Sequence, residues 1–98
     1  NISCPEVEAA AYEHESIAEL SVFGIADDKY GEVPGIVYQT KDGVELTEDE
    51  LKAFLAPRLA PFKIPAHFWQ VAEPLPRLGT QKIDRVALRR EYNAKVSA

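Results

Sequence analysis

Three segments of the chain carry apolar residues three and four positions apart, a spacing that places them along one face of a helix. These predicted helices cover residues 4–13, 47–56 and 84–94. The second helix is expected to end near residue 56 because Pro57 cannot donate a backbone hydrogen bond inside a helix.

Polar side chains at the predicted helix starts support these boundaries. Ser3 with Glu6 has the spacing of a capping box, in which each side chain bonds to the backbone of the other residue. Thr47 with Glu50 repeats the pattern at the second helix. Asp84 can cap the third helix, since a carboxylate oxygen accepts hydrogen bonds from unpaired N–H groups of a first turn.

Three further segments predict β-strands. Residues 18–25 alternate apolar and polar side chains, residues 33–40 form a mostly apolar run, and residues 67–71 contain adjacent aromatic side chains. We expect a polar loop over residues 26–32 and a turn at residues 41–43. The order helix, strand, strand, helix, strand, helix predicts a small α+β domain, in which helices cover a three-stranded sheet.

The composition fits one globular domain spanning residues 1–98, with 46% apolar and 28% charged residues. The chain contains no methionine and begins at Asn1, so we expect it to be a fragment or a processed product. It has no apolar run near the ~20 residues of a membrane-spanning helix and no signal segment at its start. We therefore expect a cytoplasmic location and no membrane span.

The cysteine and histidine content does not indicate a metal site or a nucleophile. Cys4 is the only cysteine and cannot form an internal disulfide. His14 and His67 are the only histidines, and neither has the spacing of a metal ligand or of a base for Cys4. We expect no metal in this chain and only an incidental role for Cys4.

The net charge of −5 conceals an uneven distribution. Residues 77–98 contain six basic and two acidic side chains, a net charge of +4, whereas the rest of the chain carries −9. The basic tail suggests a contact with phosphates or with an acidic neighbouring surface. The alternative is that its basic residues follow the common preference for cations near helix C-termini. The overall negative charge and the lack of an RNA-binding motif argue against a nucleic acid partner.

The loop over residues 75–85 carries Lys82 immediately before the last predicted helix. Pro76 fixes one backbone angle of this loop and Gly79 permits a turn. A lysine on such a loop can carry a positive charge into the active site of another domain. The alternative from residue types alone is a solvated surface connection.

Five segments, in the right order and spacing, resemble motifs of the C-terminal domain of adenylate-forming enzymes. This superfamily contains acyl- and aryl-CoA synthetases, nonribosomal peptide adenylation domains and luciferases, and the chain looks most like an acyl- or aryl-CoA synthetase. The segments are Asn1 to Glu8, Val22 to Asp27, Tyr30-Gly31-Glu32, Phe62-Lys63-Ile64-Pro65, and Pro76 to Arg85, which is similar to the Pro-Arg-x-x-x-Gly-Lys-Ile-x-Arg signature.

This resemblance implies a lid that closes over a larger N-terminal domain, absent from this chain, which binds ATP, Mg and a small carboxylic acid. Lys82 would contact the carboxylate and the α-phosphate during adenylation, and the lid would then rotate for thioester formation with CoA. The domain alone would be inactive. The alternatives are an enzyme that loads a carrier protein and a non-catalytic interaction module. The acyl pocket would lie in the N-terminal domain, so this chain does not identify the acid.

The resemblance also implies a CoA surface. Tyr30 and Phe62 occupy positions where some CoA ligases place aromatic residues around the adenine, and Lys63 is beside them as a phosphate partner. The alternative is that Phe62 anchors a proline-stiffened link and Tyr30 packs on the sheet. Trp69 is assigned to sheet packing in preference to ligand contact, and His67 is left open between an exposed and a lining position.

The chain departs from the signature at one position. Gln81 stands where the family has glycine, and Gly79 comes two residues earlier. This raises the question of whether the turn of the loop has moved toward Gly79. Lys82 nevertheless keeps its spacing to Pro76, Ile83 and Arg85.

Overall fold

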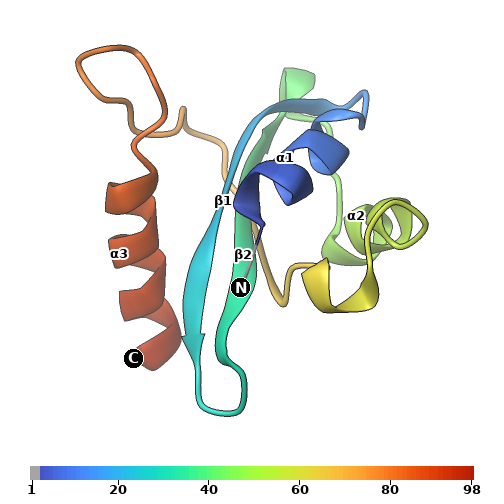
Figure 1. Ribbon diagram of the computed structural model, residues 1–98. Helices are drawn as coiled ribbons and strands as arrows, with labels where there is room; N and C mark the ends of the chain where they lie inside the picture. The colour runs from blue at the N-terminus through green and yellow to red at the C-terminus, as the bar shows by residue number, and fades with distance from the viewer. Residues whose placement is uncertain (1–2) are drawn as a thin grey trace.

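Three helices and one three-stranded sheet form the domain (Figure 1), which confirms the predicted α+β class. The computed structural model describes residues 3–98, so Asn1 and Ile2 of the first predicted motif lie outside it. The last helix extends beyond the predicted residue 94. In chain order the elements are α1 Cys4–Tyr12, β1 Ile17–Asp27, β2 Gly31–Thr40, the 3₁₀ helix η1 Lys41–Gly43, α2 Glu48–Leu55, the 3₁₀ helix η2 Pro61–Lys63, β3 His67–Gln70 and α3 Arg85–Ser97.

The strands lie in the order β1-β2-β3, with β1 antiparallel and β3 parallel to β2. The predicted loop over residues 26–32 was too long, because β1 continues to Asp27 and β2 begins at Gly31. The Asp27 side chain accepts hydrogen bonds from the backbone N–H groups of Lys29 (3.0 Å) and Tyr30 (2.8 Å). Gly31 then takes a φ of +79°, which glycine adopts without steric cost. These features close a tight hairpin with Tyr30 at its tip.

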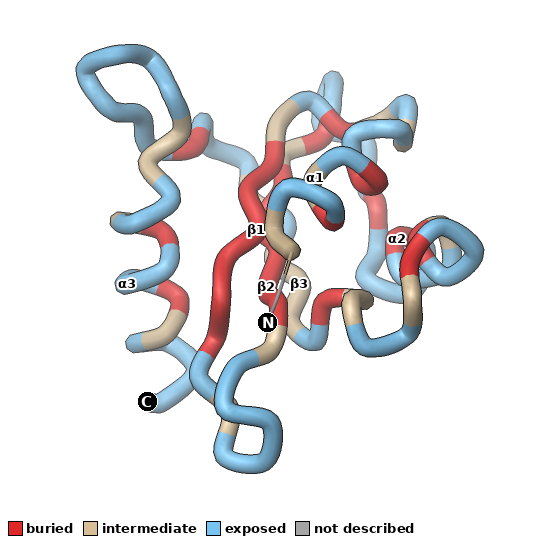
Figure 2. The backbone as a smooth tube through the Cα atoms, in the orientation of Figure 1, coloured by how far each residue is buried: buried red, intermediate tan, exposed pale blue. Residues whose placement is uncertain are grey.

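Each face of the sheet packs against its own helices (Figure 2). A bulge between Ile17 and Glu19 shifts the alternation of β1 by one residue. Ile17 therefore joins Leu20 on the α1 and α2 side, while Glu19 stays on the α3 side with Phe23. The buried strand residues of the first face are Ile17, Leu20, Val22, Ile36 and Tyr38; those of the second are Phe23, Ile25 and Val37.

Side chains of α1 and α3 satisfy the outer edge of β1. An edge strand presents unpaired backbone groups that can pair with another chain. Here alternate residues of β1 bond to side chains, so the edge is closed to further strands. Along the strand, Tyr12 Oη bonds to N (3.1 Å) and O (3.3 Å) of Leu20, Glu8 Oε2 accepts from Val22 N (2.9 Å), and Asn93 bonds to Gly24 O and Ala26 N (2.9 Å each).

The predicted capping box at α1 is wrong, whereas the one at α2 is confirmed. The Ser3 side chain makes no capping hydrogen bond. Glu6 instead accepts a hydrogen bond from Lys63 Nζ at 2.7 Å, which holds its carboxylate on η2. At α2, the hydroxyl of Thr47 accepts from Glu50 N (3.1 Å), and Glu50 Oε1 accepts from Thr47 N (2.9 Å).

The described part of the chain, residues 3–98, contains no helix with the length and apolar character needed to cross a membrane.

Candidate functional site

The loop that carries Lys82 is a small hairpin before α3 (orange in Figure 1). Arg77 and Ile83 form an isolated antiparallel bridge at its base. Asp84 N donates to Pro76 O (2.8 Å), and Asp84 Oδ1 accepts from Ala87 N (3.0 Å), which confirms the predicted cap of α3. Lys82 is exposed, one residue from the base of the hairpin.

The turn of this hairpin has not moved toward Gly79. Gln81 itself is left-handed, with a φ of +75°, while Gly79 is not. Leu78 N donates to Lys82 O at 2.7 Å, and Gln81 N donates to Leu78 O at 2.9 Å. Gln81 thus takes a conformation that costs a residue with a Cβ about 1–2 kcal/mol. The left-handed residue of the loop therefore stays at position 81, where the signature has glycine, and the backbone of Gln81 is strained as a result.

Arg77 connects this turn to the sheet. Its Nη1 donates to Gln81 O at 2.9 Å, and its Nη2 forms an ion pair with Glu19 Oε1. The other oxygen of Glu19 accepts from Leu75 N at 2.8 Å. The sequence analysis did not find this contact, because Glu19 and Arg77 are 58 residues apart.

Most cations of the basic tail are paired within the domain. Three of them contact carboxylates of the acidic part of the chain, so the tail meets an acidic surface of its own domain. Among residues 3–98, Lys82 and Arg90 are the tail cations without an ion pair. The pairs are Arg77–Glu19, Arg85–Glu8, Arg89–Glu32 and, within α3, Lys95–Glu91.

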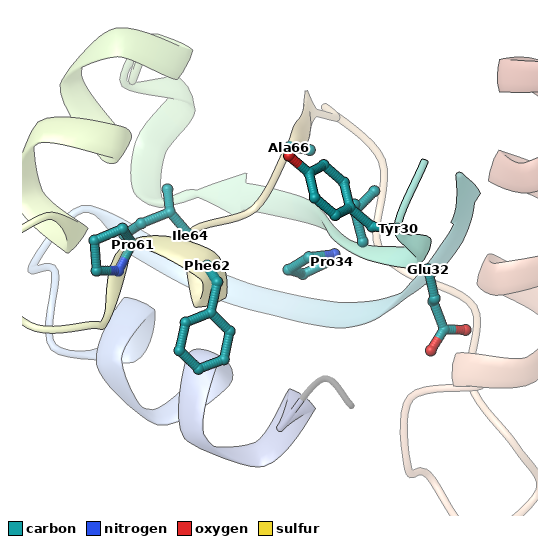
Figure 3. A pocket seen from close by; sticks show the side chains of 8 residues that line it. Tyr30, Glu32, Pro34, Pro61, Phe62, Ile64 and Ala66 are labelled. Atoms are coloured by element: carbon teal, nitrogen blue, oxygen red, sulfur yellow. The ribbon is translucent and has the colours of Figure 1, made fainter. Parts of the chain in front are cut away.

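A groove of about 510 Å³ lies at the other end of the sheet. Tyr30 from the hairpin tip and Phe62 from η2 are 68% and 72% exposed. In Figure 3 the ring of Pro34 lies between their two rings. Both rings are therefore accessible, and the packed positions considered as alternatives for them are wrong. The groove is lined by Tyr30, Glu32, Val33, Pro34, Pro61, Phe62, Ile64 and Ala66.

Two lysines flank the groove. Lys63 Nζ lies 5.5 Å from the centre of the Phe62 ring and forms an ion pair with Glu6. An anion in the groove would have to compete with that carboxylate. Lys29 Nζ lies 5.1 Å from the centre of the Tyr30 ring, and no carboxylate within residues 3–98 pairs with it. The sequence analysis missed Lys29, whose one available signal was its position next to Tyr30.

Trp69 packs on the sheet, as predicted. Its ring lies 4.5 Å from that of Tyr92 and 6.3 Å from that of Phe23, and His67 stacks on it at 5.6 Å. Both residues are half-buried and outside the lining of the groove.

Burial raises the pKa of the Cys4 thiol, with Arg85 acting in the opposite direction, so Cys4 is a weaker nucleophile than a free cysteine.

Comparison with known proteins identifies the family of this domain. The family described as the AMP-binding enzyme C-terminal domain matches residues 6–82. The chain belongs to this family. The match runs from the first helix through Lys82, so it contains the groove and the lysine loop as far as Lys82 of this AMP-binding enzyme C-terminal domain.

Relatives of this domain are CoA ligases several times its length. A 2-succinylbenzoate–CoA ligase of Geobacillus sp. (strain WCH70) is 38% identical over 89 residues, which cover 91% of this chain and 18% of the relative. A long-chain-fatty-acid–CoA ligase of Bacillus subtilis is 40% identical over 93% of this chain and 16% of the relative. A fatty acyl CoA synthetase structure from Mycobacterium tuberculosis matches with a TM-score of 0.86 and 29% identity, over 97% of this chain and 18% of that one. The chain thus spans less than a fifth of these relatives.

Proposed function

We propose that this chain is the C-terminal domain of an ATP-dependent acyl- or aryl-CoA ligase that works by domain alternation. Its Lys82 end closes over an N-terminal domain during adenylation of a carboxylic acid. Its Tyr30 and Phe62 groove then faces the same active site when CoA attacks the acyl-adenylate. ATP, CoA and the acid are substrates of the intact enzyme, and Mg belongs to the N-terminal domain.

The positions of the two candidate surfaces carry this proposal. The lysine loop is tied to β1 at Glu19, and the hairpin that bears Tyr30 begins after Asp27 at the other end of the strand. Eight residues of extended strand separate Glu19 from Asp27, which corresponds to about 26 Å. One fixed orientation of the domain cannot present both ends to one active site. A rotation of the whole domain can do so.

Lys82 has the properties that the adenylation step requires. The carboxylate and the α-phosphate are both anions and repel each other as they approach. An ammonium group held between them offsets this repulsion and the negative charge that develops on the transferring group. Because the neighbouring basic residues Arg85 and Arg89 are paired with carboxylates, Lys82 is the available cation of this loop.

The groove has the properties of an adenine site. Its volume falls in the range of small-molecule sites, and its two exposed aromatic rings can stack on a flat base. Lys29 and Lys63 lie over the rings of Tyr30 and Phe62, where an ammonium group can pair with the phosphates of CoA. Lys63 would exchange its bond to Glu6 for such a phosphate.

The test is a crossed pair of substitutions in the intact ligase, with the two half-reactions assayed separately. Lys82→Ala should lower the rate of adenylate formation from acid and ATP by about 100-fold, the loss typical of one charge-stabilising donor. It should leave thioester formation from supplied acyl-adenylate within about twofold. Phe62→Ala should raise the KM for CoA by about 10-fold, because stacking contributes about 1–3 kcal/mol per base, and should spare adenylation.

Each variant is the control for the other, since both replace an exposed side chain of the same domain. Equal losses of both half-reactions in Lys82→Ala would contradict the assignment of Lys82. A CoA KM unchanged in Phe62→Ala would contradict the groove as the adenine site. Acyl transfer to a phosphopantetheinyl carrier protein, without transfer to CoA, would favour the carrier-loading alternative. An intact protein without adenylation activity would favour an interaction module.

A further inference from the structure

Arg77 contacts both the sheet and the strained turn next to Lys82. Its guanidinium joins the carboxylate of Glu19 to the carbonyl of Gln81, the residue that immediately precedes Lys82. We refer to Glu19, Arg77 and the Gln81 carbonyl as the brace. Lys82 projects from the chain directly after it.

The sheet end of the brace is fixed. Glu19 lies on β1 next to the bulge, and its side chain is only 13% exposed. Its second oxygen accepts from the N–H of Leu75, a buried residue, at 2.8 Å. The carboxylate therefore holds the start of the loop at one oxygen and the guanidinium at the other. Charge-assisted bonds of this kind are stronger than neutral ones.

The loop end of the brace lies at a residue with a strained backbone conformation. Gln81 is left-handed with a φ of +75°, which a glycine adopts freely and a glutamine does not. The Arg77 bond to Gln81 O, at 2.9 Å, fixes the peptide plane between Gln81 and Lys82. Without it, Gln81 can relax to a right-handed conformation, and this change redirects Lys82.

We propose that Arg77 is a positioning residue for Lys82: the brace holds Gln81 left-handed and so aims the lysine. The proposal rests on the proposed function of Lys82 in adenylation. It explains why the loop keeps its turn at residue 81 although the glycine of the signature is missing there.

The test uses Arg77→Ala in the intact ligase. Adenylation should slow about five- to thirtyfold, the population ratio that corresponds to the strain of a left-handed residue. Thioester formation from supplied acyl-adenylate should stay within about twofold. Adding Gln81→Gly should restore most of the lost adenylation rate, because glycine holds the turn without the brace. Arg90→Ala, which removes an unpaired arginine and the same charge, should have no effect.

Two further variants separate positioning from general support of the fold. Arg77→Ala should cost nothing more in a Lys82→Ala background, because the brace acts through the lysine. In hydrogen exchange of the intact ligase, Arg77→Ala should speed exchange of the amides of Leu78 and Gln81, and Gln81→Gly should reverse that change. If Arg77→Ala impairs folding of the ligase, Arg77→Lys takes its place, because an ammonium group lacks the planar fork with which the guanidinium bonds to both partners.

The outcomes distinguish this proposal from the proposed function. Selective loss of adenylation in Lys82→Ala with no effect of Arg77→Ala would overturn only the brace. A loss in Arg77→Ala that Gln81→Gly fails to rescue would also overturn it. No selective loss in Lys82→Ala would overturn the assignment of Lys82, whatever the exchange experiment reports about the turn.

Discussion

Gly35, in the middle of the central strand β2, allows a close contact that alanine would disturb. A Cβ at this position would lie 2.8 Å from Cγ1 of Ile25 and 3.2 Å from Cζ3 of Trp69. Ile25 is fully buried and branched at Cβ, so it cannot move aside. Overpacking of a core typically costs about 1–3 kcal/mol, and the entropic gain from glycine to alanine in a strand offsets about 0.5–1 kcal/mol of it. Gly35→Ala should therefore destabilise the domain by about 1–2 kcal/mol.

Gly24, on the neighbouring strand β1, provides the matched control. A Cβ there would lie 2.1 Å from Oε2 of Glu32, a closer approach than at Gly35. The Glu32 side chain is flexible and 41% exposed, so it can turn away from Gly24 and give up its bond to Arg89. An exposed ion pair contributes about 0.2–1 kcal/mol, which the entropic gain offsets. Gly24→Ala should change stability by less than about 0.5 kcal/mol.

Urea unfolding followed by the fluorescence of Trp69, the only tryptophan, measures both variants. The emission of the folded state should also change in Gly35→Ala, because the new methyl group meets the indole ring, and should not change in Gly24→Ala. As a second check, Arg89→Ala should cost nothing further in the Gly24→Ala background. The reasoning is refuted if Gly24→Ala is as destabilising as Gly35→Ala, since contact distance alone would then decide the cost.

The remaining predictions concern the cap of α2 and the edge of β1. Hydrogen bonds from the backbone N–H of Thr47, and then from its hydroxyl, hold the pKa of Glu50 below its usual value of 4.5. The stability that these bonds give the folded domain is therefore present above about pH 4.5 and is lost as the pH falls through the lowered pKa. Thr47→Ala should cost about 1 kcal/mol at pH 7 and less at pH 3, and equal costs at both pH values in urea unfolding would contradict this. Asn93→Ala should cost about 0.5–1.5 kcal/mol, because it removes the hydrogen bonds that this side chain makes to the backbone of β1, against less than about 0.5 kcal/mol for the neighbouring exposed Arg90→Ala. Thermal unfolding that ranks the two equally would argue against this account of the edge.

Features set by residues close together in the sequence were predicted well. The capping box of Thr47 and Glu50 and the cap by Asp84 form within one helical turn, so local spacing determines them. In the predicted box of Ser3 and Glu6, the carboxylate of Glu6 is held by Lys63, which lies 57 positions after Glu6 in the chain. No local pattern contains that information.

In the candidate site, too, the sequence predicted the residues but not their distant partners. The resemblance to the family pointed to Lys82, Tyr30 and Phe62, and all three are exposed in the structure. The partners that hold or flank them depend on how the strands pair. Glu19 lies on the α3 side of the sheet in alternation with Phe23, but its partner Arg77 is 58 residues away. The bulge that moves Ile17 to the other face and the parallel pairing of β3 are not visible in the alternation of the sequence.

Both proposed surfaces are attached to one stable unit, and this limits how the domain can act. Glu19 anchors the lysine loop near the start of β1, and the hairpin with Tyr30 follows its end. Between them the strand is buried on both faces, and side chains satisfy its outer edge. The two ends therefore move together, and an exchange of one for the other in an active site requires rotation of the whole domain. It follows that Gly35→Ala, in the middle of the sheet, should weaken both half-reactions in parallel through stability, whereas substitutions at either end should separate them.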